Sequence, residues 1–247
     1  MHKNTIEGVR KSCKIASQVM LATSRAVFAG STTLDVEAHA VVAMKAFGVR
    51  SAFFGYHGFP GEICVSINDE VLHGIPSKRR IREGDLVKID LGVICDGFYS
   101  DMAQTFLIDD GSDECREKRR LSDATLSSLT TGMWYARAGS TVQKIAEAIS
   151  ASLKSNGYLP VKGMSGHGVG VRLHEPPSIP NEVDGWDCST VLSAGMTIAI
   201  EPMVGMGSPE ARIGSNGWVV VMSDGMPSAH FEHTILITEG DPEILTA

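Results

Sequence analysis

The chain contains an internal repeat, which restricts its fold to one built from two similar halves. Residues 29–32 and residues 138–141 share the sequence Ala-Gly-Ser-Thr, and Gly48 and Gly157 keep the same spacing of 109 positions. Each Ala-Gly-Ser-Thr supplies a hydroxyl side chain before a helical pattern of apolar residues, and each pattern stops at its glycine. The repeat therefore predicts two helices of equal length, each with a Thr N-cap and a Gly after its last turn.

A longer amphipathic helix is predicted before each of these two. The first has Asn4 at its N-cap and Glu7 at the capping-box position, and the second runs from about Asp113 to about Trp134. The apolar residues assigned to the helices are Ile6, Val9, Cys13, Ala16 and Met20 in the first, Leu34, Ala38, Val41 and Val42 in the helix ending at Gly48, and Val142, Ile145, Ala146, Ile149 and Leu153 in the helix ending at Gly157.

The repeat continues into segments that are predicted to be strands. Gly84 is followed six residues later by Asp90, and Gly195 is followed six residues later by Glu201. These matches occur in the same order as the helix matches, so they indicate a duplicated helix-helix-strand unit. Two such units packed about a pseudo-twofold axis would bring the equivalent carboxylates of Asp90 and Glu201 toward one central site.

Three carboxylates interrupt runs of apolar residues that are typical of buried strands. Asp90 lies within residues 86–94, Glu201 ends the run 197–201, and Glu232 stands beside Phe231 just before another apolar run. An ionised carboxylate removed from water costs several kcal/mol unless it is paired or bound to a metal. Several buried carboxylates with histidine, and without cysteine, are the ligands of a hard or borderline divalent cation. The sequence therefore predicts a metal site.

A predicted hairpin brings a further carboxylate to this site. Asp96-Gly97 lies between two apolar runs and is typical of a two-residue turn. With that turn, Asp90 faces Ala103 and Asp101 faces Gly92, which makes the two aspartates diagonal neighbours, roughly 7–8 Å apart at the backbone. Two metal ions at a separation of roughly 3.5–4 Å would fit between such groups. Gly92 is expected to leave room on this face.

Composition excludes some classes of partner. The formal net charge is −7, whereas a protein that binds nucleic acid needs a basic surface. The five cysteines are scattered and form no Cys-x-x-Cys pair, which favours a reducing compartment. The sequence has neither a signal-peptide pattern nor a run of about 20 apolar residues. It therefore predicts a cytoplasmic protein that does not enter a membrane, with a monomer as the default.

Seven short motifs follow one another along nearly the whole chain. They are NDEVLHGIP at 68–76, ID at 89–90, GFYSD at 97–101, GHGVG at 166–170, HE at 174–175, IEPM at 200–203 and FEHT at 231–234. In this order they resemble the methionine aminopeptidases of type I, in a minimal bacterial form. The resemblance implies the α+β pita-bread fold, with a curved antiparallel sheet backed by two helix pairs. It also implies one catalytic domain, 1–247, with halves of about 1–109 and 110–247.

The resemblance implies a metallo-exopeptidase that removes the initiator methionine from chains whose second residue is small. A water or hydroxide bridging two divalent metal ions (Co, Mn, Fe or Zn) would be the nucleophile. Glu201 would also accept and relay a proton, His174 would donate to the carbonyl oxygen, and His73 would bind the amide nitrogen side of the scissile bond. Its partners would be peptide or nascent-protein N-termini, with transient contact to the ribosome. The implied metal ligands are Asp90, Asp101, His167, Glu201 and Glu232.

The resemblance also implies a pocket for the methionine side chain, which His73 and His174 would border. Leu173 stands where many members have phenylalanine, Phe53 where cysteine is frequent, and Gly92 where threonine is common. These departures affect the expected pocket shape and metal affinity. The apolar pocket residues are Tyr56, Phe59, Cys64, Leu173 and Trp218.

Two other functions stay open at this point. The run His174-Glu175-Pro176-Pro177 is shared with proline-specific peptidases, although these usually have an additional N-terminal domain and the segment at His73 favours the methionine enzymes. Some pita-bread proteins are binding modules without activity, but these typically lose metal ligands. The remaining histidines are interpreted as structural; they are His2, His39, His57, His230 and His233.

Overall fold

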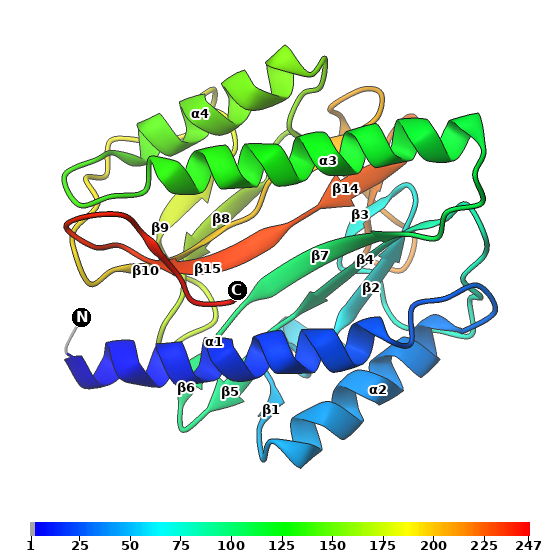
Figure 1. The fold of residues 1–247 in the computed structure, drawn as a ribbon, viewed down its shortest axis with the longest axis horizontal. Coiled ribbons are helices and arrows are strands. Elements are labelled where there is room, and N and C mark those ends of the chain that lie inside the picture. Colours follow the sequence, from blue (N-terminus) through cyan, green and yellow to red (C-terminus); the bar gives the residue numbers. More distant parts are fainter. Residues whose placement is uncertain (1–2) are drawn as a thin grey trace.

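Four helices in two pairs lie on one side of a strongly curved sheet (Figure 1). The computed structural model describes residues 3–247. One helix of each pair is long and the other is short, as the repeat predicts. The helices are α1 (Lys3–Ser24), α2 (Thr33–Ala46), α3 (Asp113–Trp134) and α4 (Val142–Ser155).

The main sheet is antiparallel, with strand order β2-β4-β7-β15-β10-β8-β9, and β16 also pairs with β15. Strands from before residue 110 occupy one half and strands from after it occupy the other, and they meet at the β7–β15 pair. The α+β architecture and the duplication are therefore confirmed. The strands are β2 (Cys64–Ile67), β4 (Leu86–Leu91), β7 (Met102–Leu107), β15 (Glu232–Leu236), β10 (Thr197–Ile200), β8 (Ser165–Gly168), β9 (Glu175–Pro180) and β16 (Glu243–Ile244).

Smaller sheets surround the main one. β5 pairs with β1 and β6, β11 pairs with β14, and β13 pairs with β12 and β3. A single 3₁₀ turn, η1 (Tyr56–Gly58), follows β1. These strands are β1 (Arg50–Ser51), β3 (Glu70–Leu72), β5 (Val93–Cys95), β6 (Phe98–Tyr99), β11 (Met203–Gly205), β12 (Ala211–Ile213), β13 (Val220–Met222) and β14 (Ser228–His230).

The repeated helix ends are mostly as predicted. α2 and α4 both have 14 residues, and Gly48 and Gly157 follow them with φ of 68° and 82°, a conformation that favours glycine. Thr32 caps α2 and forms a reciprocal capping box with Asp35. Thr141 holds the equivalent position, but its side chain makes no capping hydrogen bond. The third residue of α4 is Lys144, which offers no carboxylate to complete a box.

Two expectations about the first helix pair were wrong. α1 begins at Lys3, so Asn4 lies within its first turn and is not the N-cap. The assigned face of α2 also differs, because Leu34 and Val42 are exposed by 40% and 68%. Apolar residues occur almost all the way around α2, so their spacing does not determine which side is buried. The side that packs on the sheet consists of Val36, Ala40, Ala43 and Met44.

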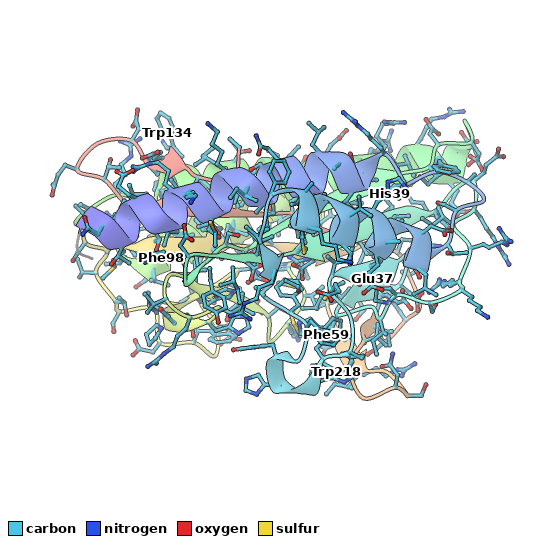
Figure 2. All side chains as sticks on the ribbon, turned by 90° about the horizontal axis from the view of Figure 1, so that it is seen from below. Glu37, His39, Phe59, Phe98, Trp134 and Trp218 are labelled. Carbon is cyan, nitrogen blue, oxygen red and sulfur yellow. The ribbon has the colours of Figure 1, made fainter. Side chains whose placement is uncertain are left out.

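Each helix pair has its own hydrophobic core against the sheet. Val36 of α2 packs in a cluster with Ile89 of β4, and Ile145 of α4 packs in a cluster with Ile235 of β15. Side chains alternate along a strand, so the neighbours of Ile89 point to the opposite face of the sheet. That opposite face carries the candidate site. Phe59, which borders the site, is labelled in Figure 2 on the side of the molecule away from α1. None of the described helices is long and apolar enough to cross a membrane.

Candidate metal centre

Strand register places carboxylates in a row across the main sheet. Asp90 of β4 faces Ala103 of β7, and Ala103 faces Glu232 of β15, so both carboxylates lie on one face with a small alanine between them. Asp101 is two residues before Ala103 and therefore belongs to the same face. The pairs Cys95–Phe98 and Ile94–Tyr99 confirm the predicted hairpin register. We call Asp90, Asp101, Glu201 and Glu232 the acidic row.

The turn of this hairpin adopts the geometry that its sequence favours. Asp96 and Gly97 have φ of 52° and 85°, as a two-residue turn with two left-handed positions requires. The expectation that Gly92 leaves free room was wrong. A Cβ atom on Gly92 would lie 2.4 Å from the carbonyl oxygen of Ser100 and 3.1 Å from the ring of Phe53. The neighbouring backbone approaches Gly92 closely, so the space that a side chain would need here is already occupied.

The second half of the chain completes the cluster. Glu201 directly follows β10, and His167 lies in β8. The Nε2 atom of His167 is 3.6 Å from Oδ2 of Asp101 and 3.5 Å from Oε1 of Glu201. Two sets of ligand atoms made up only of the predicted ligands lie within 4.8 Å of one another, Asp90 with Asp101 and Glu232, and His167 with Glu201 and Glu232; a further set joins Asp101 and His167 with His174. The five predicted ligand residues are therefore brought together, with Glu232 common to both sets.

The glycines beside His167 allow the backbone to approach its neighbours closely. A Cβ atom on Gly166 would lie 2.2 Å from the carbonyl oxygen of Ala199, and one on Gly168 would lie 2.5 Å from that of Pro176. The Nδ1 atom of His167 lies 2.9 Å from the carbonyl oxygen of Gly168, so Nδ1 carries the proton and donates it. Burial lowers the pKa of His167 to about 3. The neutral ring therefore presents the lone pair of Nε2 to the acidic row.

The buried carboxylate oxygens lack hydrogen-bond donors. Oδ1 of Asp90, Oδ1 of Asp101 and Oε1 of Glu232 accept no hydrogen bond from any described residue, and no described Lys or Arg forms an ion pair with the acidic row. Burial raises the pKa of Asp90 to about 7 and of Glu201 to about 8. Burial, followed by repulsion from neighbouring carboxylates, raises the pKa of Asp101 and Glu232 well above the usual range.

These atoms fit divalent cations. When the carboxyls are ionised, the facing groups are acceptors only, four carboxylates and one imidazole lone pair, and such groups stay together in a buried site when a cation lies between them. Oxygen and imidazole nitrogen ligands without thiolate suit Mn, Fe, Co or Zn. A separate group of Asp109, Asp110 and Cys115 has exposed carboxylates that bond the turn before α3, as expected for a solvated turn.

Two further predicted histidines lie beside the cluster. His174 directly precedes β9; its Nδ1 atom lies 2.8 Å from the hydroxyl of Tyr56, and its ring centre is 4.1 Å from that of His167. Burial lowers the pKa of His174. His73 directly follows β3 with a left-handed φ of 58°, and burial lowers its pKa to about 4. Both rings are therefore neutral near neutral pH.

His230 belongs to this site as well, although its pattern suggested a structural residue. It is only 1% exposed, its Nε2 atom lies 3.7 Å from Oε2 of Glu201, and neither ring nitrogen has a hydrogen-bond partner among the described residues. Its position two residues before Glu232 was the available signal, since residues two apart in extended chain point the same way. His39 is exposed, His233 bonds Thr246 as a structural residue would, and His2 lies outside the described residues.

An apolar cavity of about 210 Å³ opens beside the acidic row. Phe59 and Trp218 meet edge to face with ring centres 5.2 Å apart, and both are visible at the lower side of the molecule in Figure 2. All the predicted substrate-binding side chains line this cavity together with the five candidate ligands. The other lining residues are Phe53, Tyr56, His57, Phe59, Cys64, Leu72, His73, Leu173, His174 and Trp218.

Comparison with known proteins places the chain in a family. Metallopeptidase family M24 matches residues 7–239. The methionine aminopeptidase of Borreliella burgdorferi is 40% identical over 244 residues, which are 99% of this chain and 96% of that protein. The chain belongs to the methionine aminopeptidases of metallopeptidase family M24. The crystal structure of the methionine aminopeptidase from Thermotoga maritima matches with a TM-score of 0.94 and 36% identity, covering 100% of this chain and 98% of that one.

The family M24 fold is shared more widely. The prolidase from Pyrococcus furiosus matches with a TM-score of 0.80 and 27% identity over 99% of this chain, which corresponds to 64% of the prolidase. The methionine aminopeptidase from Thermotoga maritima therefore matches this chain better than the prolidase does, both in TM-score and in the share of the matched protein that is covered.

Proposed function

We propose that this chain removes the N-terminal methionine from peptides and nascent proteins whose second residue is small, and that it uses two divalent metal ions. One observation carries the proposal. Carboxylate oxygens of the acidic row that accept no hydrogen bond from any described residue lie together at the wall of an apolar cavity. The curated relatives named methionine aminopeptidase support the same activity.

In this proposal Asp90, Asp101, His167, Glu201 and Glu232 hold the two ions. Co, Mn, Fe and Zn all suit this ligand set. When bound, divalent ions in such a site supply Lewis acidity and lower the pKa of a water molecule toward neutrality. The sharing of Glu232 between the two groups of ligand atoms supports two ions rather than one.

The chain's own side chains would carry the proton and orient the peptide. The hydroxyl of Tyr56 lies 2.8 Å from Nδ1 of His174, and in this proposal it donates to that atom, which leaves the proton of the neutral imidazole on Nε2. His174 can then donate a hydrogen bond to the carbonyl oxygen as negative charge develops there. Glu201 would accept and return a proton, because its carboxylate faces the proposed metal site and lies within reach of a water molecule bound there. His73 would hold the amide nitrogen side of the scissile bond.

The cavity would select the first side chain of the substrate. Phe59, Cys64, Leu173 and Trp218 give it an apolar lining that suits a thioether and offers no charged partner to lysine or glutamate. The second residue of the substrate would have to be small, because the peptide backbone must lie close against the acidic row. In the cell this proposal describes a cytoplasmic monomer that acts on N-termini during transient contact with the ribosome.

A peptide panel tests the proposal against its alternatives. With Mn or Co added, Met-Ala-Ser and Met-Gly-Ser should release methionine, whereas Met-Leu-Ser, Lys-Ala-Ser and Ala-Pro-Ala should remain nearly intact. Cleavage of Ala-Pro-Ala in preference to Met-Ala-Ser would replace the proposal with a proline-specific peptidase. If a metal-loaded sample leaves every peptide intact, the chain is a binding module instead.

A further inference from the structure

Lys88 is a buried cation that is bonded by backbone oxygens rather than by a carboxylate. It is 1% exposed, although it lies in the middle of β4. Its Nζ atom donates to the carbonyl oxygen of Asn68 at 2.6 Å and to that of Ser228 at 3.1 Å, and it lies 3.4 Å from the hydroxyl of Ser228. These contacts tie together two segments that are far apart in the sequence, the turn after β2 and the start of β14.

The strand that Lys88 contacts is not part of the main sheet. Among the described strands, β14 pairs with β11 in a separate two-stranded sheet. Side chains from the main sheet connect to it at both ends. Lys88 of β4 bonds Ser228 at the start of β14, and Thr105 of β7 donates to the carbonyl oxygen of His230 at 2.6 Å and accepts from its amide at 3.0 Å.

The two contacts come from one place on the main sheet. Lys88 and Thr105 are cross-strand partners in the register of β4 with β7, two residues along the strands from the pair Asp90–Ala103. Residues two apart on a strand share a face, so Lys88 and Thr105 lie on the face of the acidic row. Lys88 and Thr105 therefore bond both ends of β14 from one cross-strand pair of the main sheet.

β14 carries one residue of the site and leads directly to another. His230 is its last residue, and its Nε2 atom lies 3.7 Å from Oε2 of Glu201. Two residues later, after Phe231, the chain enters β15 at Glu232, the carboxylate that both groups of ligand atoms share. A shift of β14 would therefore move the backbone that leads into Glu232, and it would also move the His230 ring that faces Glu201.

We propose that Lys88 is a positioning residue, whose ammonium group acts with Thr105 to fix β14 on the main sheet and thereby sets the geometry of Glu232 and His230 for metal binding. This inference rests on the proposed metal-binding role of the acidic row. Residues that orient metal ligands through hydrogen bonds typically change metal affinity by about 10–100-fold when they are removed.

Lys88→Met tests the proposal, and Lys118→Met is its matched control. Lys118 is likewise buried, at 5% exposure, and donates to a backbone carbonyl, that of Gly84, but it lies on α3 and also forms an ion pair with Glu114. The affinity of the metal-free protein for Mn should be measured by calorimetry, and amide hydrogen exchange of 228–230 by mass spectrometry. We expect Lys88→Met to weaken Mn binding at least tenfold and to speed exchange in this segment. Lys118→Met should leave both unchanged, whatever its effect on the melting temperature.

A second pair of measurements keeps the proposal testable if Lys88→Met folds poorly. Thr105→Val should give the same two changes in smaller degree. In Lys88→Ala, added n-propylammonium replaces the atoms that were removed, and it should restore Mn affinity where tetramethylammonium does not. Equal Mn affinity and equal exchange in Lys88→Met and wild type would overturn the proposal. If wild type itself binds no Mn, the proposed function fails, and the exchange of 228–230 alone decides whether Lys88 fixes β14.

Discussion

The acidic row and the apolar cavity beside it are built in different ways. Asp90 and Glu232 lie on strands β4 and β15, which both pair with β7, so register fixes their separation. Asp101, His167 and Glu201 lie on or directly beside strands of the same sheet. The cavity is formed mainly by segments between strands. Tyr56 and Phe59 follow β1, Leu173 and His174 precede β9, and Trp218 precedes β13, so that only Cys64 lies on the main sheet.

This difference predicts different responses to change. The acidic row gathers groups that repel one another without a cation, and the geometry of a few atoms decides whether a cation binds. The cavity is a hydrophobic cluster in which each side chain contributes part of the surface. Substitutions in the row should therefore act in an all-or-none manner, whereas substitutions in the cavity should give graded effects.

The largest effect is expected from removal of a carboxylate of the row. Asp101→Ala or Glu232→Ala should abolish turnover of Met-Ala-Ser and lower the metal content, because each removes an anionic ligand atom. Asp109→Ala is the control, since Asp109 is exposed and forms an ion pair with Arg119. Metal analysis and peptide cleavage are to be measured on the same samples. Full metal content with retained turnover in either row variant would refute the role of the row.

Metal removal should weaken the fold as well as stop turnover. In the metal-free protein the folded pKa values of Asp90 and Glu201, about 7 and about 8, exceed those of the unfolded chain. The folded state then binds protons more tightly, so its stability should rise as the pH falls from about 8 toward about 5. Thermal unfolding with and without chelator over this range measures both effects. An unchanged melting temperature after verified demetallation would contradict the coupling between metal and fold.

Loss of His174 should be less severe than loss of a ligand. His174→Ala should keep its metal and lower kcat/KM by about 10²–10³, the usual effect of removing one donor to a developing oxyanion. Tyr56→Phe removes only the hydroxyl that lies beside Nδ1 of His174 and should lower kcat/KM by a smaller factor. Loss of metal from His174→Ala would show instead that His174 is a ligand.

The smallest effect is expected in the cavity. Leu173 leaves more space than a phenylalanine would, and norleucine differs from methionine only in a CH₂ group that replaces the sulfur. The wild type should therefore cleave norleucine peptides within about tenfold of methionine peptides, because a hydrophobic pocket cannot strongly reject an isostere. Leu173→Phe should sharpen the preference for methionine through KM. Val171→Phe, at an exposed position two residues earlier, is the control. If Leu173→Phe leaves the ratio of norleucine to methionine cleavage unchanged, Leu173 does not help to select the first side chain of the substrate.

The same contrast explains what the sequence could predict. The position of Asp90 opposite Ala103 follows from a two-residue turn and strict alternation, and the bounds of α3 follow from its apolar period and its flanking residues. Such features depend on local rules. The cavity residues could be named only from the resemblance to a family, because segments between strands follow no fixed period.

Other features depended on packing that the sequence does not reveal. The buried side of α2 was ambiguous because apolar residues surround that helix. The space at Gly92 is taken by the carbonyl of Ser100, which approaches from the partner segment of the hairpin. His230 enters the site through β14, a strand bonded to the main sheet by side chains, so strand pairing did not point to it, and its spacing of two residues from Glu232 was the one signal that the sequence offered.

The central claim is that the acidic row binds two divalent ions through the residues that the register brings together. Its most direct test is a titration of the metal-free protein with Mn, with bound metal counted by native mass spectrometry for the wild type and for Glu232→Ala. We expect two ions per chain in the wild type. In Glu232→Ala we expect weakened binding of both ions, because Glu232 belongs to both groups of ligand atoms. Wild-type protein that binds no Mn, or a Glu232→Ala variant that binds two ions with unchanged affinity, would contradict it.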